Sequence, residues 1–153
     1  MADQVFAGLY GAIVVEDPVP IEVARERVLL ISDITFDSLG RVAAPTPMAP
    51  MMGREGSSIL VNGQLQPRLT ARPGERERWR VINACVSRYL RLQLAGQRIQ
   101  VLGIDSGRLA QPLDVNELVL APGNRADLLI TAATGNSVLS ALLACLNTPR
   151  VHL

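Results

Sequence analysis

Hydrophobic and polar residues alternate along much of this chain. In the segment 75–83, one face of an extended chain would carry Glu77, Trp79 and Val81, and the opposite face would carry Arg76, Arg78 and Arg80. A period of two residues is typical of a β-strand, because a helix would distribute these arginines around its circumference. The alternating arginines and glutamates further predict a sheet face that is covered by water.

Other segments show the same alternation or are short, apolar and rich in β-branched residues, which also predicts strands. Turn dipeptides separate them at short intervals: Asn62-Gly63, Pro73-Gly74 and Pro122-Gly123. This spacing predicts an all-β sandwich of about seven or eight strands, with a leading apolar segment before it. Besides 75–83, the predicted strands are 9–15 (the leading segment), 27–35, 59–61, 67–71, 89–95, 99–104, 117–120 and 126–130.

Two segments differ from this pattern. The segment 38–56 contains several prolines and three methionines, Met48, Met51 and Met52, and is predicted to be a partly disordered loop or a lid over a neighbouring domain. The segment 137–146 is rich in alanine and leucine, so it is predicted to be the one helical stretch.

Composition narrows the class of protein. The chain has 153 residues, of which 48% are hydrophobic and 19% charged, as expected of one folded domain with a short additional piece. A formal net charge of +1 gives no general attraction to nucleic acid or to a membrane surface. No apolar stretch is long enough to cross a bilayer, and the first residues lack a signal-peptide pattern. We therefore expect no nucleic-acid or membrane partner.

Candidate catalytic groups are few. Glu75 and Glu77 could form a carboxylate pair, but arginines alternate with them, so we expect no acid–base role. The 103–107 segment, Gly-Ile-Asp-Ser-Gly, lies between predicted strands and lacks the helix that a nucleotide-binding loop needs. A nucleic-acid site beside the arginine row would have only Trp79 and Tyr89 to stack on bases, so we do not expect one. Three serines have no histidine partner within the domain and are not expected to be nucleophiles: Ser57, Ser58 and Ser87.

Several motifs resemble the second cupredoxin domain of multicopper oxidases. Residues 59–64 read Ile-Leu-Val-Asn-Gly-Gln, and residues 73–83 fit the pattern P-G-x-x-x-R-x-R-x-I-N. Residues 101–107 and 120–130 continue the resemblance, the latter as L-x-P-G-x-R-x-D-x-x-I. The motifs occur in the family's order, so the resemblance implies a cupredoxin-like Greek-key β-sandwich. In it, these motifs hold turns and strand register and do no chemistry.

The beginning of the chain resembles a different part of the same family. Residues 3–18 are similar to the end of the first cupredoxin domain, which in the family follows an H-x-H copper motif. The resemblance therefore implies three parts: residues 1–20 as a remnant of the first domain, 21–135 as the second domain, and 136–153 as a divergent tail. The missing first and third cupredoxin domains are then the expected partners.

Copper chemistry is limited by the number of histidines, because a blue copper site needs two histidines and a cysteine thiolate. The chain has a single histidine, His152, which six residues separate from Cys145 in the divergent tail. The two cysteines, Cys85 and Cys145, are predicted to be buried thiols. We therefore expect no catalytic, cofactor-binding or metal-binding residue in this chain, although the parent family uses copper.

The resemblance implies a function for the complete protein. Members of the family oxidise a small reductant and reduce dioxygen to water, and their middle domain is a copper-free spacer that helps to shape the substrate cleft. The chain alone is then expected to be inactive, and bacterial members are commonly periplasmic or secreted. The alternative is a stand-alone β-sandwich that mediates interaction or assembly. In either case the apolar segment 9–15 needs an edge to pair with, in this sandwich or in a second copy, so a homo-oligomer is one expectation.

Overall fold

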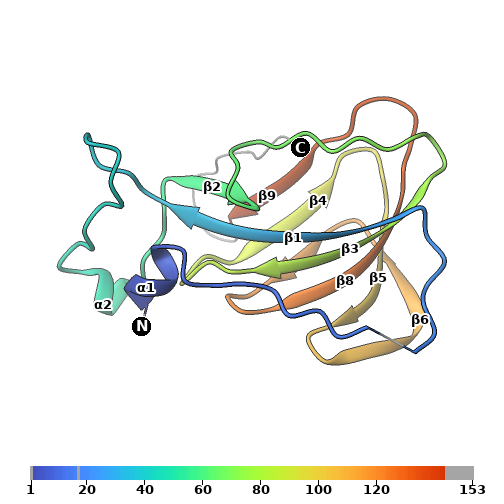
Figure 1. Ribbon diagram of the computed structural model, residues 1–153, viewed down its shortest axis with the longest axis horizontal. Coiled ribbons are helices and arrows are strands. Elements are labelled where there is room, and N and C mark those ends of the chain that lie inside the picture. Colours follow the sequence, from blue (N-terminus) through green and yellow to red (C-terminus); the bar gives the residue numbers. More distant parts are fainter. Residues whose placement is uncertain (1, 17, 144–153) are drawn as a thin grey trace.

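Two β-sheets form the body of the molecule (Figure 1). The computed structural model describes residues 2–16 and 18–143. The larger sheet has six strands in the order β2-β1-β3-β8-β5-β6, and the smaller has three in the order β7-β4-β9. The predicted all-β sandwich is therefore confirmed. The strands are β1 (Arg25–Ile34), β2 (Ser58–Val61), β3 (Arg76–Asn83), β4 (Leu90–Leu94), β5 (Ile99–Ile104), β6 (Gly107–Val115), β7 (Leu118–Leu120), β8 (Arg125–Thr131) and β9 (Leu139–Leu143).

Strands that lie side by side are often far apart in the chain. β1 runs parallel to β3, with Leu29 opposite Val81, and β3 runs antiparallel to β8, with Trp79 opposite Leu128. Only sequence-distant segments can form a parallel pair of this kind, because a tight turn joins antiparallel strands. Such a turn links β2 to the next segment at Asn62-Gly63, where Asn62 has φ 52°.

The core lies between the two sheets. The alternation in β4 places Leu90, Leu92 and Leu94 in the core, as predicted, while Arg91 and Gln93 are only partly covered. Apolar side chains of both sheets meet there, and their burial is the main source of stability. The fully buried large apolar side chains are Leu29, Ile31, Val61, Val81, Leu90, Leu92, Ile99, Val101, Leu120 and Leu128.

The middle of β3 differs from the sequence-based expectation. Arg76 is exposed, but Glu77 and Arg78 are as buried as the neighbouring Trp79, so the prediction of a water-covered face is wrong for these two residues. Each charge has an ionic partner on an adjacent strand. A buried charge is tolerated only with such a partner, and the strand pattern alone does not show the partner.

Two predicted strands are irregular segments in the structure. Residues 9–15 pass over the surface without joining a sheet, and Ile13 is 94% exposed. Residues 67–71 also join no ladder; instead the carbonyl oxygen of Thr70 accepts hydrogen bonds from Arg25 and Arg27. Both predictions were wrong because an apolar run becomes a strand only where a sheet edge is available to it.

The predicted helix 137–146 is also wrong for its described part. Residues 139–143 form β9, which pairs antiparallel with β4 from Leu90↔Leu143 to Leu94↔Leu139. Helix propensity is a weak preference, and here the open edge of β4 overrides it. Part of the predicted divergent tail thus belongs to the smaller sheet, while residues 144–153 lie outside the described part of the chain.

One strand, β6, lies where the sequence predicted no element. β6 is exposed at eight of its nine positions, so it has no alternation that the sequence could show. It forms the edge of the larger sheet, where Pro112 is tolerated because an edge strand need not donate every N–H group. Gly103 in β5 permits the close approach of β6, since a Cβ on Gly103 would lie 2.4 Å from the carbonyl oxygen of Gly107.

Two short helices lie together at one end of the sandwich (Figure 1). α1 (Ala2–Phe6) and α2 (Ala49–Met52) were not predicted, and α2 lies within the methionine-containing loop. The side chain of Arg54 joins them, because its guanidinium lies 3.7 Å above the ring of Phe6 and also contacts Asp3. Among the described residues, no helix has the length and apolar character required to cross a bilayer.

Candidate functional site

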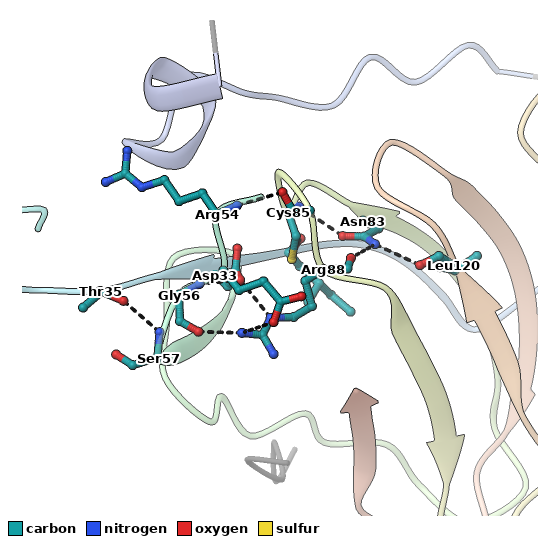
Figure 2. A network of polar contacts seen from close by, with 12 residues as sticks. Asp33, Thr35, Arg54, Gly56, Ser57, Asn83, Cys85, Arg88 and Leu120 are labelled. Carbon is teal, nitrogen blue, oxygen red and sulfur yellow. Dashed lines mark hydrogen bonds and ion pairs between the residues drawn. The ribbon is translucent and has the colours of Figure 1, made fainter. Parts of the chain in front are cut away.

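A buried ion pair lies between the end of β1 and the loop that joins β3 to β4. Arg88 donates from Nε to Oδ2 of Asp33 at 2.8 Å, and both side chains are almost completely buried. The backbone N–H of Gly56 donates to the same oxygen at 2.7 Å, and the Gly56 carbonyl accepts from Nη2 of Arg88 at 2.6 Å. Figure 2 shows these three residues converging from separate segments.

Gly56 is required by this arrangement. A Cβ on Gly56 would lie only 2.2 Å from the backbone nitrogen of Ile34, so no larger residue can bring its backbone this close to β1. One oxygen of Asp33 and one nitrogen of Arg88 have no hydrogen-bond partner among the described residues. Arg88 also lies 3.5 Å from the half-exposed carboxylate of Glu55. Asp33 has no second ionic partner recorded among the described residues, so loss of Arg88 would leave its buried charge uncompensated.

Asn83 extends the polar network from the end of β3. Its amide nitrogen donates to the carbonyl oxygens of Arg88 and Leu120, at 2.8 and 2.9 Å, and its oxygen accepts from the N–H of Cys85 at 3.0 Å (Figure 2). A fully buried amide with these partners fixes the positions of loops. Asn83 therefore ties the β3–β4 loop to β7 and has no free group for chemistry.

Cys85 lies beside this network and is buried, as predicted. Burial raises the pKa of its thiol well above the usual range, and the nearby negative charge of Asp33 raises it further. A metal ligand or nucleophile must be a thiolate. Cys85 is therefore held in its neutral, unreactive form. Cys145, the other predicted buried thiol, lies outside the described residues.

The residues present do not fit a blue copper site. Such a site combines a cysteine thiolate with two histidines, and the only histidine, His152, lies outside the described residues. Within residues 2–16 and 18–143, no group of three or more histidine, cysteine, aspartate or glutamate side chains is placed to hold a metal ion. The protonated Cys85 agrees with this, so no step of copper chemistry is assigned to the described part of the chain.

Glu75 and Glu77, the candidate carboxylate pair, have separate hydrogen-bond partners and do not act together. Glu77 accepts from Nε of Arg27 at 2.7 Å and from Nε1 of Trp79 at 2.8 Å, whereas Glu75 accepts from the N–H of Arg72 at 2.9 Å in a turn. Burial alone would raise the pKa of Glu77. The hydrogen bonds from Arg27 and Trp79 and the charges of Arg27 and Arg25 outweigh it and lower the pKa. Glu77 is therefore an anion at neutral pH and is poorly suited to shuttle a proton.

This lowered pKa makes the stability of the protein depend on pH. A carboxylate whose folded pKa lies below its unfolded value stabilises the fold above the unfolded pKa, and this contribution is lost as the pH falls through the folded pKa. We expect Glu77→Gln to lower the free energy of unfolding at pH 7 and to cost less at acid pH. Urea unfolding at several pH values measures the difference, and an equal cost at all of them would contradict the assignment.

Arg78 is the centre of a second ionic cluster. It contacts Asp127 at 2.5 Å and Glu26 at 3.3 Å, and Glu26 also accepts from Arg80 at 3.1 Å. These pairs link β1, β3 and β8 across the larger sheet. The predicted arginine row is thus largely neutralised by carboxylates, which leaves it poorly suited to bind an anionic partner.

The other sequence candidates also have structural roles. Ser87 accepts a hydrogen bond from the N–H of Arg54, and the N–H of Ser57 donates to Thr35. Asp105 has φ 54° and accepts from the N–H of Arg125 at 3.0 Å, so the 103–107 segment is a turn. No histidine lies among the described residues, so these serines have no base. Ser58 lies within β2.

One cavity in the described part of the chain has a volume of about 610 Å³. Trp79 and Leu94 contribute apolar walls, and Glu77 and Gln97 contribute polar ones. The carboxylate of Glu77 already accepts three hydrogen bonds, two from Arg27 and one from Trp79.

The sequence interpretation missed the Asp33–Arg88 pair. A signal was present, because Asp33 lies near the end of the predicted strand, shortly after the apolar run 28–31, and a buried charge requires a partner. Nothing in the sequence identified Arg88 as that partner, since 55 positions separate the two residues. Only the fold brings the end of β1 to the β3–β4 loop.

Comparison with known proteins gives consistent results. The multicopper oxidase family model matches residues 27–147. Cell division protein FtsP of Salmonella typhimurium is 33% identical over 145 residues, and the laccase of Bacillus subtilis is 35% identical over 157 residues. Both alignments cover 90% of this chain but 30% of the relative. The chain thus spans about a third of the length of these curated relatives.

Solved structures show the same relationship. The multicopper oxidase of Campylobacter jejuni superposes with a TM-score of 0.82 and is 30% identical, covering 97% of this chain and 33% of that one. The 2F4 variant of the McoA multicopper oxidase from Aquifex aeolicus gives a TM-score of 0.79 and 34% identity, covering 93% and 34%. Because the family model covers most of the sequence and the sandwich superposes on these enzymes, the chain belongs to the multicopper oxidase family and has its cupredoxin-like fold.

Proposed function

We propose that this chain is the copper-free middle domain of a multicopper oxidase. In this role it holds the copper-bearing first and third domains in their relative positions and contributes to the substrate cleft. The complete protein would oxidise a small reductant and reduce dioxygen to water, whereas the chain alone would be inactive.

One observation carries this proposal: the chain has a single histidine, while a blue copper site needs two histidines and a thiolate. The state of Cys85 supports the same conclusion, because its thiol is buried and its pKa is raised. The residues that the family would use for copper must then be supplied by other domains.

Exposed apolar residues support a role between neighbouring domains. Residues 13–15 line a hollow together with residues of β3, β5 and β8 of the larger sheet, and Leu9, Ile13 and Val15 are mostly exposed. Apolar surface of this kind commonly marks a protein–protein contact. The resemblance of this segment to the end of a first cupredoxin domain provides a partner, because a complete first domain would cover it.

Oxygen uptake tests the proposed inactivity. After loading with Cu(II) and removal of free metal, the chain should consume no more oxygen in the presence of a phenolic reductant than buffer treated in the same way. The full-length protein, tested in parallel, should consume oxygen. Turnover by the isolated chain would contradict the spacer role, whereas inactivity of the full-length protein would contradict the oxidase assignment.

A second candidate function comes from the relatives named cell division protein FtsP, which are as similar to this chain as the laccase is. A full-length protein of that type would act in division rather than in the oxidation of a substrate. Deletion of the gene distinguishes the two: a division defect in cells whose purified protein shows no oxygen uptake would favour this candidate.

A further inference from the structure

A single arginine holds the short helix α1 against the body of the sandwich. The guanidinium of Arg54 lies 3.7 Å from the centre of the Phe6 ring and contacts the carboxylate of Asp3 at 2.5 Å. It also donates to the carbonyl oxygen of Ala43, and the Arg54 side chain is only 11% exposed. An arginine that stacks on an aromatic ring while its charge is paired makes a strong and directional contact.

Phe6 is buried outside the main hydrophobic core. It is 4% exposed, yet it is not part of the connected cluster of apolar side chains between the two sheets. The turn around it is closed by backbone hydrogen bonds, because the N–H groups of Ala7 and Gly8 donate to the carbonyl oxygens of Asp3 and Val5 at 3.0 and 2.9 Å. Arg54 therefore supplies a contact to α1 that the core does not supply.

The backbone that carries Arg54 is fixed to the loop between β3 and β4. The N–H of Arg54 donates to Oγ of Ser87 at 2.9 Å, and a Cβ on the preceding Gly53 would lie 2.6 Å from that same oxygen. Two positions further on, the carbonyl of Gly56 accepts from Arg88 at 2.6 Å. Figure 2 shows the Arg54 side chain pointing away from the buried ion pair, toward α1. A side chain presented from an anchored backbone loses less conformational freedom when it makes its contact.

A second anchor holds the same N-terminal segment. The hydroxyl of Tyr10 donates to Oγ of Ser32 at 2.7 Å, and Ser32 is a buried residue of β1. Residues 2–10 are therefore attached to the sandwich at two points, one at Arg54 and one at Ser32.

The segment 3–18 resembles the end of a first cupredoxin domain, and the proposed spacer function requires that domain to be held in a fixed position. We propose that the contact of Arg54 with Phe6 and Asp3 is the joint that fixes the first domain to this one, with Arg54 as the positioning residue. The identity of the partner rests on the proposed function, whereas the contact itself is made by residues of this chain. A joint at residues 3–6 restrains the first domain at its own end, so that the domain does not pivot about the stretch 9–15 that follows.

Hydrogen exchange of the chain tests the joint. Arg54→Met keeps apolar length but removes the guanidinium, so the backbone amides of residues 7–10 should exchange about tenfold faster, as expected for the loss of a desolvated cation–π contact and an ion pair. Arg41→Met, which changes an exposed arginine of the same connecting segment, should leave these amides unchanged. In both variants the amides of β3 and β8 should exchange as in the unaltered chain, which checks that the sandwich is folded.

Phe6→Leu removes the other side of the same contact. It should accelerate the exchange of the same amides, and its effect combined with Arg54→Met should be smaller than the product of the two single effects, because both variants break one contact. Phe6 lies outside the core cluster, so this variant carries the test if Arg54→Met disturbs the sandwich. Unchanged exchange in the folded Arg54→Met chain, or effects that multiply, would overturn the joint.

The position of the first domain is measured in the full-length protein by the distance between two spin labels. One label is placed on the first domain and the other at Gln111→Cys on the exposed strand β6, with Cys145→Ser in every sample. We expect a narrow distance distribution that Arg54→Met broadens and Arg41→Met does not, because domains move relative to one another where their contact is weak. A distribution that stays narrow in Arg54→Met would overturn the proposal. Neither measurement uses copper or oxygen, so the joint and the oxidase assignment can fail separately.

Discussion

Replacing Arg88 with methionine should lower the free energy of unfolding by about 3–5 kcal/mol, because removal of one partner of a buried ion pair leaves the other charge uncompensated. In this protein the stranded charge would be Asp33, whose side chain is nearly inaccessible to water. The carbonyl oxygen of Gly56 would also lose the donor Nη2 of Arg88, so the start of β2 should loosen. Urea unfolding followed by circular dichroism measures the change.

Two further variants make this test specific. Arg98→Met removes an exposed arginine that lies 3.9 Å from Asp114, and it should cost less than about 1 kcal/mol. Asp33→Asn combined with Arg88→Met removes both charges and should cost less than the sum of the two single changes. A cost below about 1 kcal/mol for Arg88→Met alone would show that water reaches Asp33 and that the pair is not buried in solution.

The second large effect is expected at Trp79. Trp79→Ala should lower the free energy of unfolding by about 3–5 kcal/mol, because it removes a large buried side chain from the core. It also removes the indole N–H that donates to Glu77 at 2.8 Å. Since Trp79 is the only tryptophan, unfolding must be followed by far-ultraviolet circular dichroism rather than by its fluorescence.

Trp79→Phe separates the two contributions. Phenylalanine keeps most of the apolar bulk but cannot donate to the Glu77 carboxylate, so its cost should be about 1.5–3 kcal/mol and smaller than that of alanine. A change of less than about 1 kcal/mol for Trp79→Ala would place the indole on the surface. Equal costs for the two variants would show that the hydrogen bond, and not the packing, is the main contribution of this side chain.

The strands that the sequence predicted correctly are those that bury one face. In β4, for example, leucines alternate with Arg91 and Gln93, and the structure buries the leucines. β6 has no buried face, so its nine residues carried no such pattern. Residues 139–143 illustrate a different reason for failure: their composition favours a helix, and only the free edge of β4 makes them a strand.

Charged residues were the hardest to interpret from the sequence. The alternation of Glu77 and Arg78 is the same whether the strand faces water or lies under neighbouring chain segments. Their burial depends on Arg27, Glu26 and Asp127, which the fold brings from two other strands. The turns at Gly74 and Gly123 were easier to predict from the sequence. Both glycines have φ values near 82°, which glycine adopts readily, and each follows a proline in a typical turn dipeptide.

The absence of resident copper is the central claim about this chain, and the Cu(II) retained per chain tests it most directly. The chain is incubated with Cu(II) in air and desalted, and copper is then measured against protein while the visible spectrum is recorded. We predict far less than one copper per chain and no intense blue absorption, because the single histidine and the protonated Cys85 cannot complete a blue copper site. One tightly held Cu(II) per chain with strong visible absorption would contradict this account.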